Sequence, residues 1–250
     1  MWSGVKKYLI GGVLLSISLG GCGHIGDMVP GGGFLAGLFG GGSGDLDGYR
    51  RHAAPEVVGA IEAASRRTGV PVRYLLATAA QESGLRPDAR APNGSAVGLF
   101  QFIESTWLAT VKRYGREHGL AAVAAEIRID RRGRPSVADP ARRRHVLGLR
   151  GDPRLSALMA AELARENRAR LERALGRRVE AVDLYMAHFL GTRGATELLR
   201  VLKHTPDAPG PRLLPAAARA NRNVFYDGGP HRPRSLRQIF TAVAARMERA

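Results

Sequence analysis

The sequence has a single cysteine, Cys22, and few aromatic residues, which make up 6% of its 250 residues. One cysteine can form neither an internal disulfide nor a cysteine-based metal cage. The zinc-binding pattern His-Glu-x-x-His, the phosphate-binding pattern Gly-x-x-x-x-Gly-Lys and the nucleophile elbow Gly-x-Ser-x-Gly are also missing. We therefore expect no metal and no cofactor, so the chemistry has to come from the side chains.

Negative charge is scarce as well, with 22 aspartate and glutamate residues against 38 lysine and arginine residues. A protein this basic is attracted to polyanions, which include nucleic acid, anionic lipid and acidic cell-wall polymer. An arginine-rich composition also accompanies some genomes of high G+C content, so the charge alone leaves the partner open. With 44% hydrophobic residues, the chain can bury one good core.

The N-terminal residues have the features of an export signal. Lys6 and Lys7 precede an apolar stretch over residues 8–19, which is too short to span a membrane comfortably. Leu-Gly-Gly-Cys follows, ending at Cys22, and this order resembles the processing box of bacterial lipoproteins. The resemblance implies a signal peptide over residues 1–21 and lipidation of Cys22, which anchors a protein stably in a bilayer. The alternative is a plain signal peptide with an incidental cysteine.

Residues 22–48 are rich in glycine, which predicts a flexible tether. Two apolar pairs within it, Phe34-Leu35 and Leu38-Phe39, allow a second interpretation in which the segment rests on the membrane surface. Together, the N-terminal features predict a protein that faces the periplasm and is anchored by lipid, with the outer membrane as the expected location.

From Pro55 onwards the pattern of apolar residues is helical, and strand signals are nearly absent. Prolines and glycines mark most ends of the expected helices. These helices run from Pro55 to Gly69, from Pro71 to Gly84, from Ser105 to Gly115 or Gly119, from Asp152 to Gly176, and over residues 182–190, 195–202 and 235–247. Only the loop over residues 88–97 suits a short hairpin. The sequence thus predicts a mainly α domain.

Two segments outside these helices are distinctive. Residues 128–150 are dense in arginine, and we interpret them as a solvated linker, although contact with an acidic wall polymer is an alternative. Residues 205–250 are expected to form a C-terminal extension whose final helix packs on the preceding domain. Within it, residues 221–226 mix amides and aromatics, which suits sugar contact or packing on the core equally well.

Glu82 stands at the end of an apolar helical stretch, residues 72–80, and just before Gly84. The C-terminal end of a helix carries negative partial charge, so this position is unfavourable for a structural carboxylate. A second apolar segment, residues 98–102, follows and is expected to half-bury the side chain. Partial burial favours the uncharged acid, which is the form that donates a proton in general acid catalysis. The sequence therefore indicates Glu82 as the catalytic residue.

The residues around Glu82 resemble those of a known enzyme family. Glu82-Ser-Gly-Leu-Arg-Pro-Asp-Ala is followed by a short loop, by Gly-Leu-Phe-Gln ending at Gln101, and by Thr106. This order is similar to that of the lytic transglycosylase family with a lysozyme-like, SLT-type catalytic domain. The family pattern is Glu-Ser-x-x-x-Pro-x-Ala, a variable loop, Gly-Leu-hydrophobic-Gln and a nearby Thr. The likeness covers about residues 55–204.

The resemblance implies a mainly α fold like that of goose-type lysozymes, with a substrate cleft, over residues 49–204. It also implies cleavage of the β-1,4 bond between N-acetylmuramic acid and N-acetylglucosamine in peptidoglycan strands. Most glycosidases use two carboxylates for such a cleavage. In this family one glutamate acts first as acid and then as base, and the substrate's own 6-hydroxyl attacks. The implied products are therefore 1,6-anhydromuramyl sugars.

The family pattern also implies roles for residues near Glu82. Ser83 and Gln101 are expected to hold the sugar and the transition state. Phe100 is expected to line either the cleft or the core.

A later segment departs from the family. Family members have Ala-Tyr-Asn-x-Gly where this chain has Ala-His-Phe-Leu-Gly, so His188 and Phe189 replace the tyrosine and the asparagine. His188 can donate a hydrogen bond to Glu82 as the tyrosine does, although a lone histidine on a helix is often structural. Phe189 cannot make the hydrogen bonds of an asparagine, and Tyr185 is the candidate to supply them.

Alternative functions remain open at this stage. Glu104 is a rival acid that we interpret as a helix cap, and Asp88 is a possible second carboxylate for a lysozyme-type muramidase. A non-catalytic peptidoglycan-binding lipoprotein is a further alternative. The export signal argues against nucleic acid as the partner. We expect a monomer that acts on peptidoglycan glycan strands and contacts the membrane through its lipid anchor.

Overall fold

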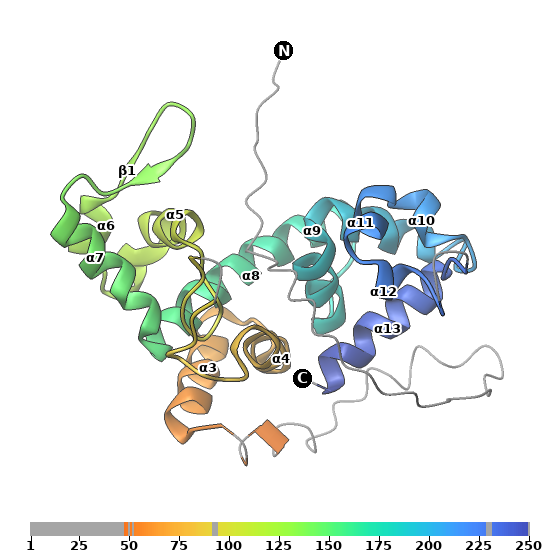
Figure 1. Ribbon diagram of the computed structural model, residues 1–250, viewed down its shortest axis with the longest axis horizontal. Coiled ribbons are helices and arrows are strands. Elements are labelled where there is room, and N and C mark those ends of the chain that lie inside the picture. Colours follow the sequence, from red (N-terminus) through yellow and green to blue (C-terminus); the bar gives the residue numbers. More distant parts are fainter. Residues whose placement is uncertain (1–47, 50, 52, 92–94, 229–231, 250) are drawn as a thin grey trace.

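The computed structural model describes residues 48, 49, 51, 53–91, 95–228 and 232–249, which form a mostly helical molecule (Figure 1). The predicted mainly α fold is confirmed. The predicted signal peptide, Cys22 and all but the last residue of the predicted tether lie outside the described residues. Within the described part of the chain, no helix is long and apolar enough to cross a membrane.

The elements follow one another closely along the chain. The first are α3 (Pro55–Thr68), α4 (Val72–Ser83), α5 (Glu104–Tyr114), η1 (Gly115–His118), α6 (Ala121–Glu126), β1 (Arg128–Ile129) and β2 (Pro135–Ser136). They are followed by α7 (Pro140–Gly148), η2 (Leu149–Gly151), α8 (Pro153–Leu175) and α9 (Ala181–Leu202). The last are α10 (Gly210–Leu213), α11 (Pro215–Ala220), α12 (Arg222–Phe225) and α13 (Leu236–Arg249).

Helix ends lie where the sequence places prolines and glycines. Pro55 and Pro153 occupy the first turns of α3 and α8, where a missing N–H costs nothing. Gly69 and Gly176 end the same helices with φ of 68° and 65°. This left-handed conformation favours glycine, because a Cβ atom makes it costly for other residues.

The long helix α8 organises the core. It packs against α3, α4 and α5, which precede it in the sequence, and against α9, which follows it. The final helix, α13, packs against α9 and α4 and thus reaches the helix that carries Glu82. In the segment of amides and aromatics, Val224 and Phe225 are buried in the core, which favours packing over sugar contact for these two residues.

Most of the arginine-rich segment is exposed, as predicted for a solvated segment, but it forms regular elements and is not a linker. It forms the antiparallel pair β1–β2, in which Ile129 lies opposite Pro135, and continues into α7. The loop predicted to hold a hairpin contributes only isolated bridges, from Val97 to Arg90 and to Phe102. The pair β1–β2 has a local cause. The side chain of Asp130 accepts hydrogen bonds from backbone N–H groups of its own turn. Such a turn brings the two strands that flank it into register.

The predicted split of α9 is confirmed. Two helices were expected, over residues 182–190 and 195–202, and the structure has two helical segments that meet at a kink at Gly191. The φ of 72° and ψ of 158° at Gly191 are accessible to glycine and strained for other residues. The break falls shortly after His188 and lets the helix change direction there.

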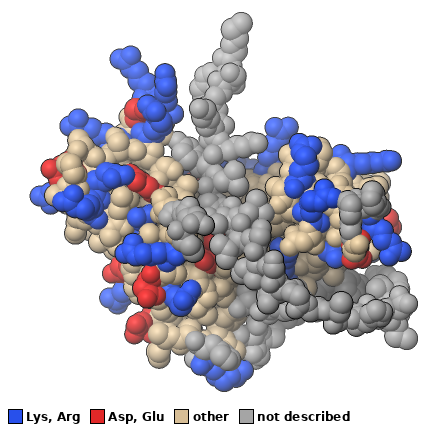
Figure 2. All heavy atoms as spheres, in the orientation of Figure 1, with Lys and Arg blue, Asp and Glu red and all other residues tan. Residues whose placement is uncertain are grey.

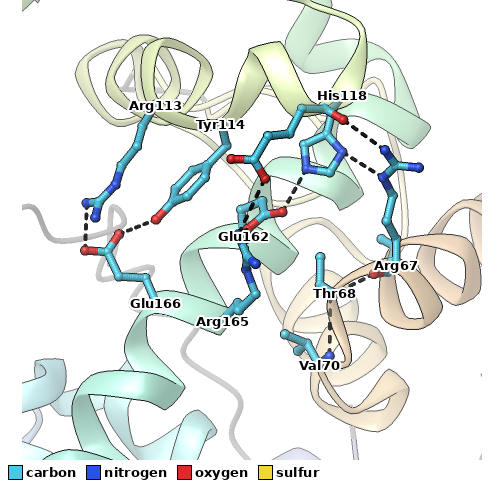
Figure 3. Close-up of polar contacts among 11 residues, drawn as sticks. Arg67, Thr68, Val70, Arg113, Tyr114, His118, Glu162, Arg165 and Glu166 are labelled. Carbon is cyan, nitrogen blue, oxygen red and sulfur yellow. Dashed lines mark hydrogen bonds and ion pairs between the residues drawn. The ribbon is translucent and has the colours of Figure 1, made fainter.

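A polar cluster ties α3, η1 and α8 together (Figure 3). His118 and Glu162 are joined by a contact of 2.8 Å between Nε2 and Oε1, and their side chains are only 2% and 3% exposed. Arg67 donates from Nε to His118 Nδ1 at 3.1 Å, and Arg165 donates to the other oxygen of Glu162 at 2.7 Å. Since Nδ1 accepts from Arg67, His118 is the Nε2–H tautomer and donates to Glu162.

Candidate active site

Glu82 lies in the last turn of α4, whose buried face consists of Tyr74, Leu75, Leu76, Ala77, Thr78, Ala79 and Ser83. The helix ends at Gly84, with φ 61°, and Leu85 N–H bonds back to the carbonyl of Ala79 at 3.3 Å. This termination leaves Glu82 at the edge of the core, with its side chain 13% exposed. The carboxyl group is thus largely enclosed and still reachable from solvent.

Ser83 fastens the next loop to α4. Its hydroxyl donates towards the carbonyls of Leu99, at 2.8 Å, and Ala79, at 3.0 Å, and accepts from the N–H of Arg86 at 3.1 Å. The side chain is buried and engaged with the protein's own backbone. These contacts make Ser83 a residue that positions the loop, and its predicted contact with the sugar stays a prediction.

Gly98 permits a very close approach between two segments. It has φ of 86°, and a Cβ atom at this position would lie 2.0 Å from the carbonyl oxygen of Arg150. The Arg150 side chain is buried and donates to the carbonyls of Ser95, at 2.7 Å, and Phe102, at 3.0 Å. Burial lowers the pKa of Arg150. Arg150 therefore stabilises the loop that lies opposite Glu82. The sequence alone did not distinguish this arginine from its neighbours.

Gln101 adopts a strained backbone conformation, with φ of 46°. Its side-chain amide donates to the carbonyls of Ala89, at 3.1 Å, and Gly98, at 3.0 Å, so both N–H donors serve the loop. A left-handed conformation at a non-glycine residue persists only where the surroundings enforce it, and such residues cluster at functional sites. Gln101 shapes the loop, and its predicted contact with sugar stays a prediction.

His188 meets Glu82 across the fold. Nε2 of His188, from α9, lies 3.0 Å from Oε1 of Glu82, from α4. The His188 side chain is 8% exposed. Its other ring nitrogen, Nδ1, is buried without a hydrogen-bond partner among the described residues. A buried N–H without an acceptor is costly, so the ring proton belongs on Nε2, and His188 donates it to Glu82.

Two buried tyrosines lie close enough to sense the charge of Glu82. Burial raises the pKa of Tyr74 to about 12, with a further contribution from Glu82. Burial also raises the pKa of Tyr185, where Arg246 acts in the opposite direction and Glu82 in the same direction. Both hydroxyls therefore stay uncharged at neutral pH. Tyr185 is 1% exposed, so it backs the site and does not present its hydroxyl at the surface.

The two phenylalanines of the loop belong to the core. Phe100 and Phe102 are 3% and 1% exposed, and Phe102 packs edge-on against Trp107 with ring centroids 5.2 Å apart. Together with other side chains they line a small apolar recess next to His188. The recess is lined by Tyr74, Thr78, Phe100, Phe102, Ala160 and His188.

The two rival acids are in different surroundings. Glu104 makes a two-pronged ion pair with Arg143, with contacts of 2.8 and 2.5 Å. Its interpretation as a helix cap is wrong, since α5 has Ile103 at its N-cap and no side-chain cap. The reason is that α7 brings an arginine within reach, and a bidentate guanidinium is a stronger partner than a backbone N–H. Asp88 is exposed.

Phe189 replaces the asparagine of the family pattern, and a side chain of the C-terminal helix α13 lies over its ring. The guanidinium carbon of Arg246, on α13, lies 5.9 Å from the centre of the Phe189 ring. The same arginine lowers the pKa of Tyr185 against the effect of burial. The C-terminal helix thus places a positive charge near the back of the site, which the sequence alone did not reveal.

Glu117, His118 and Glu162 bring three possible metal-ligand atoms within 4.8 Å of one another. Their hydrogen bonds argue against a metal at this place. Coordination through Nε2 of His118 would move the ring proton to Nδ1, where it would face the N–H of Arg67 (Figure 3). The arrangement fits a structural cluster.

A comparison with known families identifies this part of the chain. Residues 59–124 match the family model described as Transglycosylase SLT domain. The matched segment contains α4 with Glu82, the loop with Gln101, and α5. The match supports a lytic transglycosylase family with a lysozyme-like domain and, in general, a transglycosylase type of peptidoglycan cleavage. His188 lies beyond the match, in α9.

Proposed function

We propose that the protein is a peptidoglycan lytic transglycosylase in which Glu82 is the acid/base and His188 holds it in place. The observation that carries this proposal is the contact of 3.0 Å between His188 Nε2 and Glu82 Oε1, in surroundings where both side chains are largely enclosed. The family match contributes the reaction type and the substrate class.

In this proposal the two carboxyl oxygens of Glu82 have different roles. Oε1 accepts the hydrogen bond from His188, and Oε2 is then the oxygen that carries the proton for the glycosidic bond. As that proton leaves, Glu82 becomes a carboxylate, and a hydrogen bond to a charged acceptor is stronger than one to a neutral acceptor. His188 thereby stabilises the developing charge in the transition state. The carboxylate can next accept the proton of the attacking hydroxyl.

The nature of the attacking group follows from the other acids. A hydrolytic mechanism needs a second carboxylate near the cleavage point. Glu104 is occupied by Arg143, and Asp88 is an exposed loop residue. This supports attack by the substrate's own 6-hydroxyl and release of 1,6-anhydromuramyl products from the bond between N-acetylmuramic acid and N-acetylglucosamine.

The deciding experiment is mass spectrometry of purified peptidoglycan digested by the full chain. Anhydro products are lighter than hydrolysed products by one water, about 18 Da, because no water enters as nucleophile. Glu82→Gln keeps the shape of the side chain and cannot donate a proton, so this variant should fold normally and release almost nothing. Glu104→Gln is the matched control and should keep its activity.

Two outcomes would contradict the proposal. Products with reducing ends would make the protein a muramidase and direct attention to Asp88. Intact binding to peptidoglycan without products of either kind would leave only a non-catalytic wall-binding protein.

The location of the protein is a separate proposal. The Leu-Gly-Gly-Cys sequence that ends at Cys22 supports lipid anchoring of a protein that faces the periplasm. Such an anchor would hold the active site within reach of the peptidoglycan.

A further inference from the structure

The hairpin over residues 128–136 projects from the body of the molecule (Figure 1). We refer to it as the arginine hairpin. Its base is fixed, since β2 packs against α5. Between residues 128 and 144 the chain has seven arginines and two aspartates, and all seven arginines are exposed. Figure 2 shows blue side chains gathered over this end of the molecule.

The turn at its tip is built by one side chain. Oδ1 of Asp130 accepts from the backbone N–H groups of Arg132, at 2.8 Å, and Arg134, at 2.9 Å, and Oδ2 accepts from the Arg134 side chain at 2.7 Å. The hydrogen bond from the Arg134 backbone, followed by that from its side chain, lowers the pKa of Asp130. Asp130 is thus committed to the turn. Arg131 and Arg132 make no ion pair with any described residue, so their charges face outward.

The same hairpin carries an exposed apolar side chain. Ile129 is 45% exposed, and it is the one large hydrophobic side chain that is exposed in the described part of the molecule. It lies opposite Pro135 in the two-stranded sheet, next to Arg128. An isolated cationic tip would suit any polyanion. This hairpin combines the exposed Ile129 with Arg131 and Arg132, which make no ion pair with a described residue. The combination is better suited to a surface that is charged outside and apolar within.

We propose that the arginine hairpin binds the surface of an anionic lipid bilayer. The guanidinium groups of Arg131 and Arg132 would bind lipid phosphates, for which their planar geometry is suited. Ile129 would enter the boundary between headgroups and acyl chains, as apolar side chains of surface-binding segments do. This contact is separate from the proposed catalysis and would hold the catalytic domain itself against the membrane.

The first test measures binding of the full chain, carrying Cys22→Ser so that it lacks the proposed lipid anchor, to sedimented vesicles. Vesicles of phosphatidylglycerol mixed with phosphatidylcholine are compared with vesicles of phosphatidylcholine alone, which report the contribution of the N-terminal segment. A basic residue near an anionic surface contributes about 1 kcal/mol, so Arg131→Ala/Arg132→Ala should weaken binding to the anionic vesicles about 30-fold. The control, Arg178→Ala/Arg219→Ala, removes the same charge from exposed positions elsewhere and should bind nearly as the wild type.

The second test locates the contact. Cys22 is the only cysteine, so Ile129→Cys in a Cys22→Ser background provides a single thiol for an environment-sensitive fluorophore. Its emission should shift to the blue with anionic vesicles and stay unchanged with neutral ones. Ser136→Cys in the same background is exposed on the other strand and serves as the comparison.

The outcomes decide the matter. Equal weakening in both double variants would show that only total charge counts and would overturn the proposal, as would an unchanged emission at position 129. A hairpin variant that loses binding to a soluble acidic wall polymer, yet binds vesicles as the wild type does, would assign the hairpin to that polymer instead. Circular dichroism and peptidoglycan cleavage should be the same in all variants, because the hairpin is outside the proposed site.

Discussion

Replacing His188 by phenylalanine tests how the proposed site works. The change removes the donor that lies 3.0 Å from Glu82 Oε1 and keeps a ring of similar size in the same enclosed position. A hydrogen bond to a charged group contributes about 1.5–3 kcal/mol. Because this bond is strongest when Glu82 has given up its proton, most of the loss should fall on the transition state. We expect kcat/KM to fall by about 10- to 150-fold.

The assay is release of soluble muropeptides from purified peptidoglycan, with circular dichroism and thermal unfolding measured beside it. His188→Tyr restores a donor of the kind that the family has at this position, so it should recover much of the activity that His188→Phe loses. In a Glu82→Gln background, His188→Phe should cause little further loss, because two residues that act as a unit are not additive. Turnover by His188→Phe within twofold of the wild type would refute the reasoning and make His188 structural.

Three further predictions concern other parts of the molecule. Cys22→Ser should release the protein from the membrane fraction and abolish labelling by a clickable fatty acid; labelling that persists would contradict lipidation. Glu162→Ala should lower the free energy of unfolding in urea by about 1–3 kcal/mol, because it leaves the buried N–H of His118 without an acceptor; an unchanged midpoint would contradict this role. The raised pKa of Tyr74, about 12 against an ordinary 10, gives stability that is present below pH 10 and is lost as pH rises towards 12. Tyr74→Phe should therefore flatten the fall of stability over that range, and an equally steep fall would refute the assignment.

The helices and the position of Glu82 could be predicted because their signals are local. A proline at the start of an apolar helical pattern and a glycine after its end mark the helix boundaries. The helices α3 and α8 show this at Pro55 and Gly69 and at Pro153 and Gly176. Glu82 stood out because a carboxyl group at a helix C-terminus lacks a local electrostatic reason to be there. The structure adds the burial that the sequence pattern implied, with the side chain largely enclosed.

The remaining features depend on contacts between distant segments. Nothing in the local sequence distinguishes Arg150, which is buried under the loop, from Arg143, which pairs with Glu104 at the surface. The sequence did not predict the hairpin, because each of its strands has two residues and an alternating strand pattern needs a longer run. The turn is instead stabilised by the side chain of Asp130. Arg246 could not be placed near Phe189 before the packing of α13 was known.

Glu82 and His188, the proposed catalytic pair, join two helices although they are 106 residues apart in the sequence. The segment that matches the SLT family model ends at residue 124, so it contains the proposed proton donor, Glu82, without the histidine that contacts it. The recognisable domain and the working unit are consequently different pieces of the chain. Any truncation or domain graft made at the boundaries of the match would carry Glu82 into a new setting with one of its oxygens unsupported. If His188 positions Glu82 as proposed, the smallest transferable unit extends at least through α9.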